Sequence, residues 1–305
     1  MKRFIDSIYL KSSLQKKKLE RLLAECGDET YWNYADSFAD KFTKYLNSVG
    51  LSEDFAVDAY LKMCSDILNE QIKFLKTGMY SCSSVSDAYE SVYSKEDVMR
   101  PYMIGVALSQ FLWENHYKIY TFYLDIVNRT ENKGIADYLE IGAGHGLFTA
   151  AAIENLKAKN YKVVDLSPIS INICKNILGY LIHGNQVMPE FVEMNALDFK
   201  EDTQFDFITM GEVIEHVEDP KPLLQNISRL LKPQGKAFLT TCANSPAIDH
   251  IYLFHNVEEI RELFSNCGLE IVEEIILPIG KNEGSSIDNS LLGTSYAAVV
   301  KKAGC

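Results

Sequence analysis

Three glycines, Gly142, Gly144 and Gly146, follow an apolar segment at 138–141 and precede a segment of helical composition at 149–154. This order predicts a buried strand, a glycine turn and the start of a helix. Glycine adopts backbone angles that are closed to other residues, and it has no Cβ to keep a ligand away from the chain. We therefore expect a ligand to lie against this turn.

The residues beside the turn indicate the charge of that ligand. The spacing G-x-G-x-G alone is common to several nucleotide-binding folds. A dinucleotide fingerprint has its third glycine three places after the second, where this chain has Leu147. Glu140, just before the turn, would repel a pyrophosphate but could pair with a cationic amino group. The pattern favours a cationic ligand.

The segment E-I-G-A-G-H-G at 140–146, followed by V-V-D-L-S-P at 163–168, resembles the class I S-adenosylmethionine-dependent methyltransferases. Further matches to this family follow in order at 194–199, 205–217 and 231–236, and together they cover roughly 135–302. Gln234 departs from the family's L-K-P-G-G turn, which implies a different turn type. The resemblance implies S-adenosyl-L-methionine as the cofactor and S-adenosyl-L-homocysteine as the product.

The resemblance also implies how the cofactor is held. In the family the glycine turn passes under the amino-acid part of the cofactor, and an acid at the place of Asp165 holds the two ribose hydroxyls. Asn195 replaces the aspartate usual near the adenine, and its amide oxygen can still accept a hydrogen bond. The full set of implied cofactor-binding residues is Glu140, Gly142, Gly144, Gly146, Asp165, Leu166, Asn195, Ala196 and Gly211.

Composition excludes several other classes of protein. The formal net charge of -12 gives no basic field that would attract nucleic acid. The seven cysteines are odd in number and form no C-x-x-C pair, which favours neither a disulfide framework nor a zinc site. No apolar segment reaches signal-peptide length or the ~20 residues of a membrane span. We expect a cytoplasmic protein without a nucleic-acid or membrane partner.

The 305 residues suffice for two domains, and we predict a helical N-terminal domain at 1–130 and a cofactor-binding domain at 131–305. The second domain alternates strands and helices, which predicts a doubly wound, seven-stranded, mostly parallel α/β sheet. Its strands are expected at 135–141, 161–165, 189–194, 205–210 and 235–241. The last two, at 269–277 and 295–301, form an antiparallel edge pair in the family, with a loop at 280–286 between them.

A helix expected at 102–127 is apolar almost all round, apart from a polar middle that includes Trp113, Asn115 and His116. These side chains are either core residues with backbone partners or substrate-binding residues that line a pocket. Residues 80–86, which are small and polar, are expected to form a linker or a mobile loop.

Methyl transfer from a sulfonium requires alignment of the acceptor and, for a protonated acceptor, a base. His250, in the long loop after the fifth strand, is the predicted base, because its unperturbed pKa lies near neutrality. Glu212 is the second catalytic candidate, and Tyr252 and His255 are predicted substrate contacts. Asp249 could orient His250.

Metal binding is an alternative for this loop. Some methyltransferases of 2-oxo acids bind a metal through histidines in such a loop, and His250, His255 and Asp249 have suitable ligand types. No fixed spacing requires a metal, so we predict none. Glu215 and His216 are expected mainly to start the following helix.

The predicted function is methyl transfer to the oxygen, nitrogen or carbon of a small organic acceptor in specialised metabolism, with the helical domain as a lid. The same helices could instead form a homodimer interface. Two other functions remain open. One is methylation of a protein, and the other is a non-catalytic regulator that binds S-adenosylmethionine.

Overall fold

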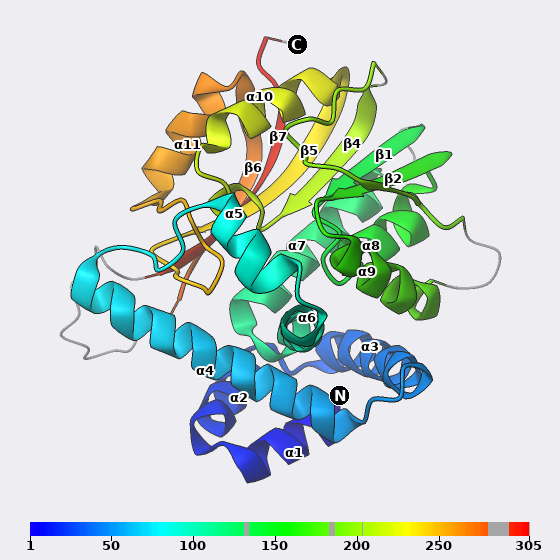
Figure 1. The fold of residues 1–305 in the computed structure, drawn as a ribbon. Helices are drawn as coiled ribbons and strands as arrows, with labels where there is room; N and C mark the ends of the chain where they lie inside the picture. Colours follow the sequence, from blue (N-terminus) through cyan, green and yellow to red (C-terminus); the bar gives the residue numbers. More distant parts are fainter. Residues whose placement is uncertain (131–133, 183–186, 203, 280–292, 305) are drawn as a thin grey trace.

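The computed structural model describes residues 1–130, 134–182, 187–202, 204–279 and 293–304 (Figure 1). Its centre is a seven-stranded sheet of order β3-β2-β1-β4-β5-β7-β6. The strands β1 to β5 are parallel, and β7 runs antiparallel to β5 and β6. The predicted doubly wound sheet with an antiparallel edge pair is confirmed. The strands are β1 Asp137–Ile141, β2 Asn160–Asp165, β3 Glu190–Glu193, β4 Phe205–Gly211, β5 Leu231–Ala243, β6 Leu269–Pro278 and β7 Thr294–Lys302. The loop expected at 280–286 lies outside the described residues.

Helices cover both faces of the sheet. The helices α10 (Pro220–Leu230) and α11 (Val257–Asn266) lie on one face, and α8 (Leu147–Leu156) and α9 (Pro168–Leu181) lie on the other (Figure 1). Successive strand residues point to opposite faces, so Tyr138 and Leu139 of β1 belong to different hydrophobic clusters. Both faces are therefore buried, as a parallel sheet requires.

The N-terminal part is helical, as predicted. Several of its helices begin at side-chain caps, of which Ser52 accepts the N–H of Phe55, and Gly78 ends the same helix with a left-handed backbone. The helices are α1 Lys2–Lys11, α2 Ser13–Cys26, α3 Glu29–Ser48, α4 Glu53–Thr77, α5 Val85–Ala88, the π-helix η1 Tyr89–Tyr93, α6 Glu96–Leu112 and α7 Glu114–Thr130. None of the described helices is both long and apolar enough to cross a membrane.

The N-terminal helices share one buried cluster with the α8/α9 face of the sheet. Tyr123 of α7 shows the connection: its hydroxyl lies 3.3 Å from that of Tyr138 in β1 and 3.2 Å from Oγ1 of Thr209 in β4. Its ring lies 4.8 Å from the ring of Phe148 in α8. The helical part therefore packs directly on the sheet.

Two sequence predictions need correction. The helix expected at 102–127 is two helices, because Trp113 adopts an extended backbone (φ -119°, ψ 130°) between α6 and α7. The linker expected at 80–86 is bonded to the α/β part, and its end starts α5, which Ser84 caps. The Tyr80 hydroxyl accepts the N–H of Ser245 at 3.1 Å, and the N–H of Val85 donates to Glu218 at 2.8 Å.

Candidate functional site

A cavity of about 870 Å³ lies at the carboxyl ends of β1, β2, β4 and β5. The glycine turn after β1 and the ends of these strands form one side of it, and α4, α6 and α7 contribute the other. Ligands of open α/β sheets collect where the strand order reverses, which here is beside β1. The volume lies within the range of pockets that bind small molecules.

The first two glycines of the turn line this cavity. Gly142 and Gly144 have left-handed backbones, with φ of 84° and 50°. A Cβ on Gly142 would lie 2.7 Å from Cγ2 of Val213. Gly146 is absent from the described lining, and a Cβ there would lie 3.1 Å from Sγ of Cys174 in α9. Gly142 and Gly144 therefore leave room for a ligand, whereas Gly146 allows α8 and α9 to pack closely.

Glu140 lies at the cavity but is only 3% exposed. Its Oε2 accepts hydrogen bonds from the hydroxyls of Thr149 and Tyr138, the latter at 3.1 Å. Burial raises the pKa of Glu140 to about 8, although these two hydrogen bonds oppose the shift. A buried carboxyl of this kind is a fitting partner for an ammonium group, which would stabilise its charged form.

Asp165 ends β2 and borders the cavity. Its carboxylate accepts the N–H groups of Ala143 and Ser167, both at 2.7 Å, and the hydroxyl of Ser170 at 3.2 Å. Burial raises its pKa. A carboxylate has about four acceptor sites, so one remains for a ribose hydroxyl. Asp165 also ties the glycine turn to the start of α9.

The other implied cofactor residues also line the cavity. Asn195 turns its Oδ1 back to the N–H of Leu197 at 2.9 Å, so part of its acceptor capacity is used within its own loop. A Cβ on Gly211 would lie 3.0 Å from Cε2 of Phe148, which explains the glycine at the end of β4. The remaining members of this set are Leu166 and Ala196.

Glu212 has an unusual backbone at the cavity wall. Its φ of 51° lies in the left-handed region, which residues other than glycine rarely adopt. Thr240 of β5 holds it there, because Oγ1 of Thr240 accepts the N–H of Glu212 at 3.0 Å and donates to its Oε1 at 2.8 Å. Such strain persists only where the surroundings enforce it, and it clusters at functional sites.

Glu215 is a buried carboxyl with an unused acceptor. Its Oε2 accepts the hydroxyl of Thr241 at 2.9 Å, while Oε1 has no hydrogen-bond partner among the described residues. Burial, followed by the charge of Glu212, raises the pKa of Glu215 well above its usual range. No lysine or arginine in the described part of the chain forms an ion pair with either glutamate.

His216 and Asp249 lie next to these glutamates. Nδ1 of His216 is 2.9 Å from the carbonyl oxygen of Asp249, and since a carbonyl only accepts, Nδ1 carries the hydrogen and Nε2 a lone pair. The Asp249 carboxylate accepts the hydroxyls of Tyr93 at 3.0 Å and Tyr102 at 3.3 Å. Among the described residues no hydrogen bond joins Asp249 to His250, so Asp249 does not orient its neighbour in the predicted way.

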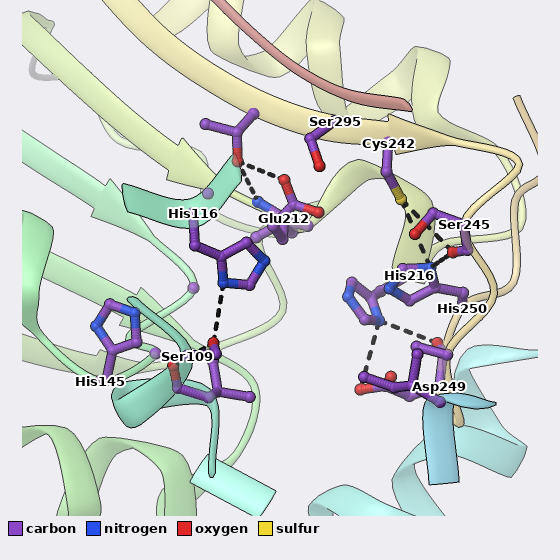
Figure 2. A pocket seen from close by; sticks show the side chains of 18 of the residues that line it. Ser109, His116, His145, Glu212, His216, Cys242, Ser245, Asp249, His250 and Ser295 are labelled. Carbon is purple, nitrogen blue, oxygen red and sulfur yellow. Dashed lines mark hydrogen bonds and ion pairs between the residues drawn. The ribbon is translucent and has the colours of Figure 1, made fainter. Parts of the chain in front are cut away.

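His250 lies at the cavity as expected. Its Nδ1 donates to the carbonyl oxygen of Ser245 at 2.7 Å, which again leaves the lone pair on Nε2. Its ring stands edge-on to that of His216, with 4.8 Å between the ring centres (Figure 2). Burial lowers the pKa of His250 to about 4, so the ring is neutral at neutral pH.

Two overlapping groups of side chains could hold a metal ion. One consists of Glu215, Cys242 and His250, and the other of His216, Asp249 and His250, with ligand atoms within 4.8 Å of one another in each group. Histidines whose Nδ1 hydrogens are bound to carbonyls present Nε2 in a fixed direction, as metal-binding histidines do. The unused oxygen of Glu215 fits a cation as well.

The helical part contributes three of the predicted substrate residues. Trp113, Asn115 and His116 all line the cavity at the break between α6 and α7. The indole N–H of Trp113 donates to the hydroxyl of Tyr60 at 3.0 Å, and Asn115 donates to Oγ of Ser295 at 2.7 Å. These polar side chains therefore have protein partners and also border the pocket.

The structure does not bring Tyr252 and His255 to the described lining of the cavity. Tyr252 packs against the cluster on the α10/α11 face of the sheet. The side chain of His255 is 65% exposed and lies 3.3 Å from Glu259. The loop turns back after Asp249, because the N–H groups of Ile251 and Tyr252 bond to the carbonyl oxygen of Glu215.

Sequence reasoning missed several residues of the site. Tyr93 and Tyr102 reach Asp249 across 156 and 147 residues of sequence, and no local pattern marks such contacts. Ser109 of α6 bonds to Nδ1 of His116 at 2.9 Å. Thr240 gave a usable signal, because a hydroxyl at the end of a strand faces the ligand edge of an α/β sheet.

A strand, a glycine turn, an acid at the end of the second strand and a cavity at the switch point define the class I S-adenosylmethionine-dependent methyltransferases. Residues 114–274, just over half of the chain, match the family described as "Methyltransferase domain". The chain belongs to this family.

The chain is similar in sequence to ubiquinone biosynthesis O-methyltransferases. That of Idiomarina loihiensis is 31% identical over 38% of this chain and 46% of its own length. That of Nitrosomonas europaea is 27% identical over 53% of this chain and 68% of its own length. The chain thus spans about half to two thirds of the length of these relatives.

Solved structures share the fold. The mitomycin 7-O-methyltransferase MmcR has a TM-score of 0.53 at 11% identity, over 82% of this chain and 70% of that one. The N-methyltransferase NodS of Bradyrhizobium japonicum, solved with S-adenosyl-L-homocysteine, has a TM-score of 0.51 at 16% identity. The match covers 72% of this chain and 99% of that one. At these identities the likeness supports the fold alone.

Proposed function

We propose that this protein transfers the methyl group of S-adenosylmethionine to a hydroxyl oxygen of a small organic molecule with a sizeable apolar part. The observation that carries this proposal is the single cavity that joins Glu140, Gly142 and Asp165 to the apolar side of α4 and α6. That side presents Met63, Ile67, Leu68, Met99, Met103 and Val106. The helical part would then act as the acceptor-binding cover of the site.

Oxygen is the acceptor atom that the relatives favour, since their names describe O-methyltransferases. The polar side chains of the cavity also favour a hydroxyl group as the acceptor. The neutral ring of His250 presents the lone pair of Nε2, and the carboxyl of Glu212 at the cavity wall is an acceptor, so a hydroxyl donor would find partners there. A polypeptide acceptor would have to enter beneath α4 and α6, which favours a small molecule.

The chain's own residues would position the cofactor. Glu140 would pair with the ammonium group, Gly142 and Gly144 would leave room for the amino-acid part, and Asp165 would bind a ribose hydroxyl. The cofactor, when bound, supplies a methyl group on a cationic sulfur. Catalysis then depends mainly on alignment and on exclusion of water by the helical cover.

The same proposal includes a divalent cation beside the acceptor. The two groups, Glu215 with Cys242 and His250 and His216 with Asp249 and His250, combine carboxylate oxygens with imidazole nitrogens and a thiol, a mixed set that suits first-row divalent metals. Such an ion would offset the buried carboxyl charges and polarise an acceptor hydroxyl. The unpartnered Oε1 of Glu215 is the observation that favours it.

Radiolabel transfer tests the function. The protein is incubated with methyl-labelled S-adenosylmethionine and either 4-hexylcatechol or a cell extract separated into metabolites and macromolecules. We expect label in the catechol or the metabolite fraction, and none with Asp165→Ala, provided that circular dichroism shows this variant to be folded. Label only in precipitated protein would establish protein methylation instead. Cofactor binding without any transfer would indicate a non-catalytic regulator.

Metal binding has a separate test. We expect isothermal titration of the chelator-treated protein with Mn²⁺ to show one site, which Glu215→Gln together with His250→Ala weakens at least about tenfold, the effect of one or more lost ligands. His255→Ala is the matched control, because that exposed histidine lies outside the described lining. Equal binding by the wild type and the double variant would contradict the cation site.

The domain boundary at 130/131, a homodimer through the helical part, a cytoplasmic location and a role in specialised metabolism stay predictions. A dimer interface would need exposed side chains on these helices. Tyr31 is not one of them, because it is buried and its hydroxyl donates to the carbonyl oxygen of Phe111 at 2.7 Å. Light scattering of the wild type would decide the oligomeric state.

A further inference from the structure

The hydrogen bonds around His116 determine which ring nitrogen carries its hydrogen. Oγ of Ser109 lies 2.7 Å from the carbonyl oxygen of Val106, so the serine hydroxyl donates its only hydrogen there. The same Oγ lies 2.9 Å from Nδ1 of His116, and both contacts are hydrogen bonds only if this oxygen accepts from Nδ1. Nδ1 is consequently protonated, and the lone pair is on Nε2.

The ring of His116 is held firmly. It packs on Trp113 with 4.7 Å between the ring centres, and Trp113 is itself bonded to Tyr60. The backbone carbonyl of His116 accepts the side-chain N–H of Gln110 at 2.6 Å. These contacts come from α4, α6 and the break between α6 and α7, so they fix both the position and the tautomer of the ring.

Nε2 of His116 is available to a ligand. No group among the described residues bonds to it, and the ring lines the cavity with Nε2 turned away from Ser109 (Figure 2). Burial lowers the pKa of His116 to about 4, so the ring is neutral at neutral pH. A neutral imidazole with a free lone pair at a ligand cavity is a proton acceptor.

The neighbouring histidine has the opposite arrangement. Nδ1 of His145, in the glycine turn, accepts the N–H of Leu147 at 3.2 Å, which places its hydrogen on Nε2. After burial, the charge of His116 is a second cause that lowers the pKa of His145, so His116 lies near the glycine turn (Figure 2). Of these two rings, only His116 offers a base.

We propose that His116 is the general base of the reaction, with Ser109 as the residue that positions it. The inference rests on the proposed transfer to a hydroxyl. As the acceptor oxygen forms its bond to the methyl carbon, the carbon–sulfur bond breaks and its electron pair goes to sulfur. The hydroxyl proton passes to Nε2 of His116. The positive charge thus leaves the sulfur as one appears on the imidazole, so the net charge of the pocket is unchanged.

A weakly basic imidazole suffices for this step. An oxygen that is forming a third bond becomes strongly acidic, so a base with a lowered pKa still accepts its proton. The ring is unprotonated and ready before the acceptor binds, because protonation in the buried pocket is unfavourable. His216 and His250 would be engaged by a cation, which leaves His116 free to take the proton.

Single-turnover methylation of 4-hexylcatechol tests the assignment. We expect His116→Ala and His116→Asn to slow the transfer step about 10²–10⁴-fold, the usual contribution of a general base, with S-adenosylmethionine affinity unchanged by calorimetry. Added imidazole should restore part of the rate to His116→Ala but not to His116→Asn. Ser109→Ala should show a smaller loss in kcat, and His255→Ala none. An unchanged transfer rate in both His116 variants would overturn the proposal.

A second measurement does not depend on the acceptor. ¹⁵N NMR of histidine-labelled protein, with His116→Asn for assignment, should show the lone pair on Nε2 of His116 and on Nδ1 of His145. A hydrogen on Nε2 of His116 would overturn the proposal even if methylation occurs. Failure of the wild type to methylate any hydroxyl would instead refute the proposed function, while the NMR result still decides the tautomer.

Discussion

Single buried carboxyls set much of the chemistry of this site. Glu140 in β1 and Glu215 in the segment after β4 are both buried, and burial raises the pKa of each. They differ in their partners, because both bonds to Glu140 come from hydroxyls on one oxygen, whereas Glu215 retains an oxygen without a partner. Each is therefore poised for a cation, the former for an ammonium group and the latter for a metal ion.

Glu140 should make cofactor binding depend on pH. Its pKa of about 8 in the free protein would fall when an ammonium group binds, so binding releases a proton below pH 8. The affinity for S-adenosylmethionine should therefore rise with pH up to about 8, by at most about tenfold per pH unit. Calorimetry from pH 6 to 9 measures this.

The Glu140→Gln variant should bind S-adenosylmethionine more weakly at pH 8, and its affinity should change much less with pH. Glu270→Gln is a suitable control, since Glu270 is a half-exposed residue of β6 paired with Lys301. Equal pH dependence in Glu140→Gln and the wild type would refute the assignment of Glu140.

At the scale of elements, short breaks in regular structure form the site. The glycine turn separates β1 from α8, and the extended Trp113 separates α6 from α7. Glu212, with its left-handed backbone, directly follows the end of β4. Each break occurs where an element meets the cavity. Regular helices and strands satisfy their own backbone groups, so a ligand can approach the chain only where that regularity stops.

Gly142→Ala should disturb the turn. The residue has a φ of 84°, and the new Cβ would lie 2.7 Å from Cγ2 of Val213. We expect a loss of about 1–3 kcal/mol in the free energy of unfolding from the backbone strain, and weaker cofactor binding. Urea unfolding and calorimetry measure the two effects.

Gly179→Ala is the matched control. Gly179 lies within α9, has no positive φ and has nothing within 4 Å of an added Cβ, so alanine should leave stability unchanged or raise it slightly. A Gly142→Ala variant as stable and as tightly binding as Gly179→Ala would contradict this view of the turn.

In the molecule as a whole, the helical part and the sheet share one core. The cluster that contains Phe42 and Tyr60 of the N-terminal helices also contains Tyr138, Phe207 and Phe238 of the sheet. We therefore expect the two parts to unfold together. Fluorescence reports the helical part, which holds both tryptophans of the chain, Trp32 and Trp113, and hydrogen exchange of β4 amides reports the sheet.

Tyr123→Ala should lower the free energy of unfolding by the same amount whether fluorescence or hydrogen exchange follows the transition. Its fully buried ring contacts α8 and β5, so removal should cost about 3–5 kcal/mol. Tyr123→Phe should cost about 1 kcal/mol, since it loses only the hydroxyl bonds. Leu10→Ala is the control, because Leu10 is exposed. Two separate transitions would show that the parts are independent.

The linear sequence already determined the α/β part. Its strands are short apolar runs separated by glycine and proline signals, so local periodicity predicts both the elements and their order. The cofactor residues were predictable for the same reason, since Glu140, Gly142, Gly144 and Asp165 each sit at the end of a strand. Strand ends in a parallel sheet meet at one edge whatever the rest of the chain does.

The acceptor side was decided by tertiary structure. Trp113 breaks an otherwise continuous helical pattern, and its indole N–H donates to Tyr60 of another helix. His216 lies beside His250, and Asp249 faces Tyr93, through contacts between segments distant in sequence. A side chain's role as base, ligand or core residue depends on which partner occupies each of its polar atoms. Those partners come from distant segments, and only the folded chain brings them together.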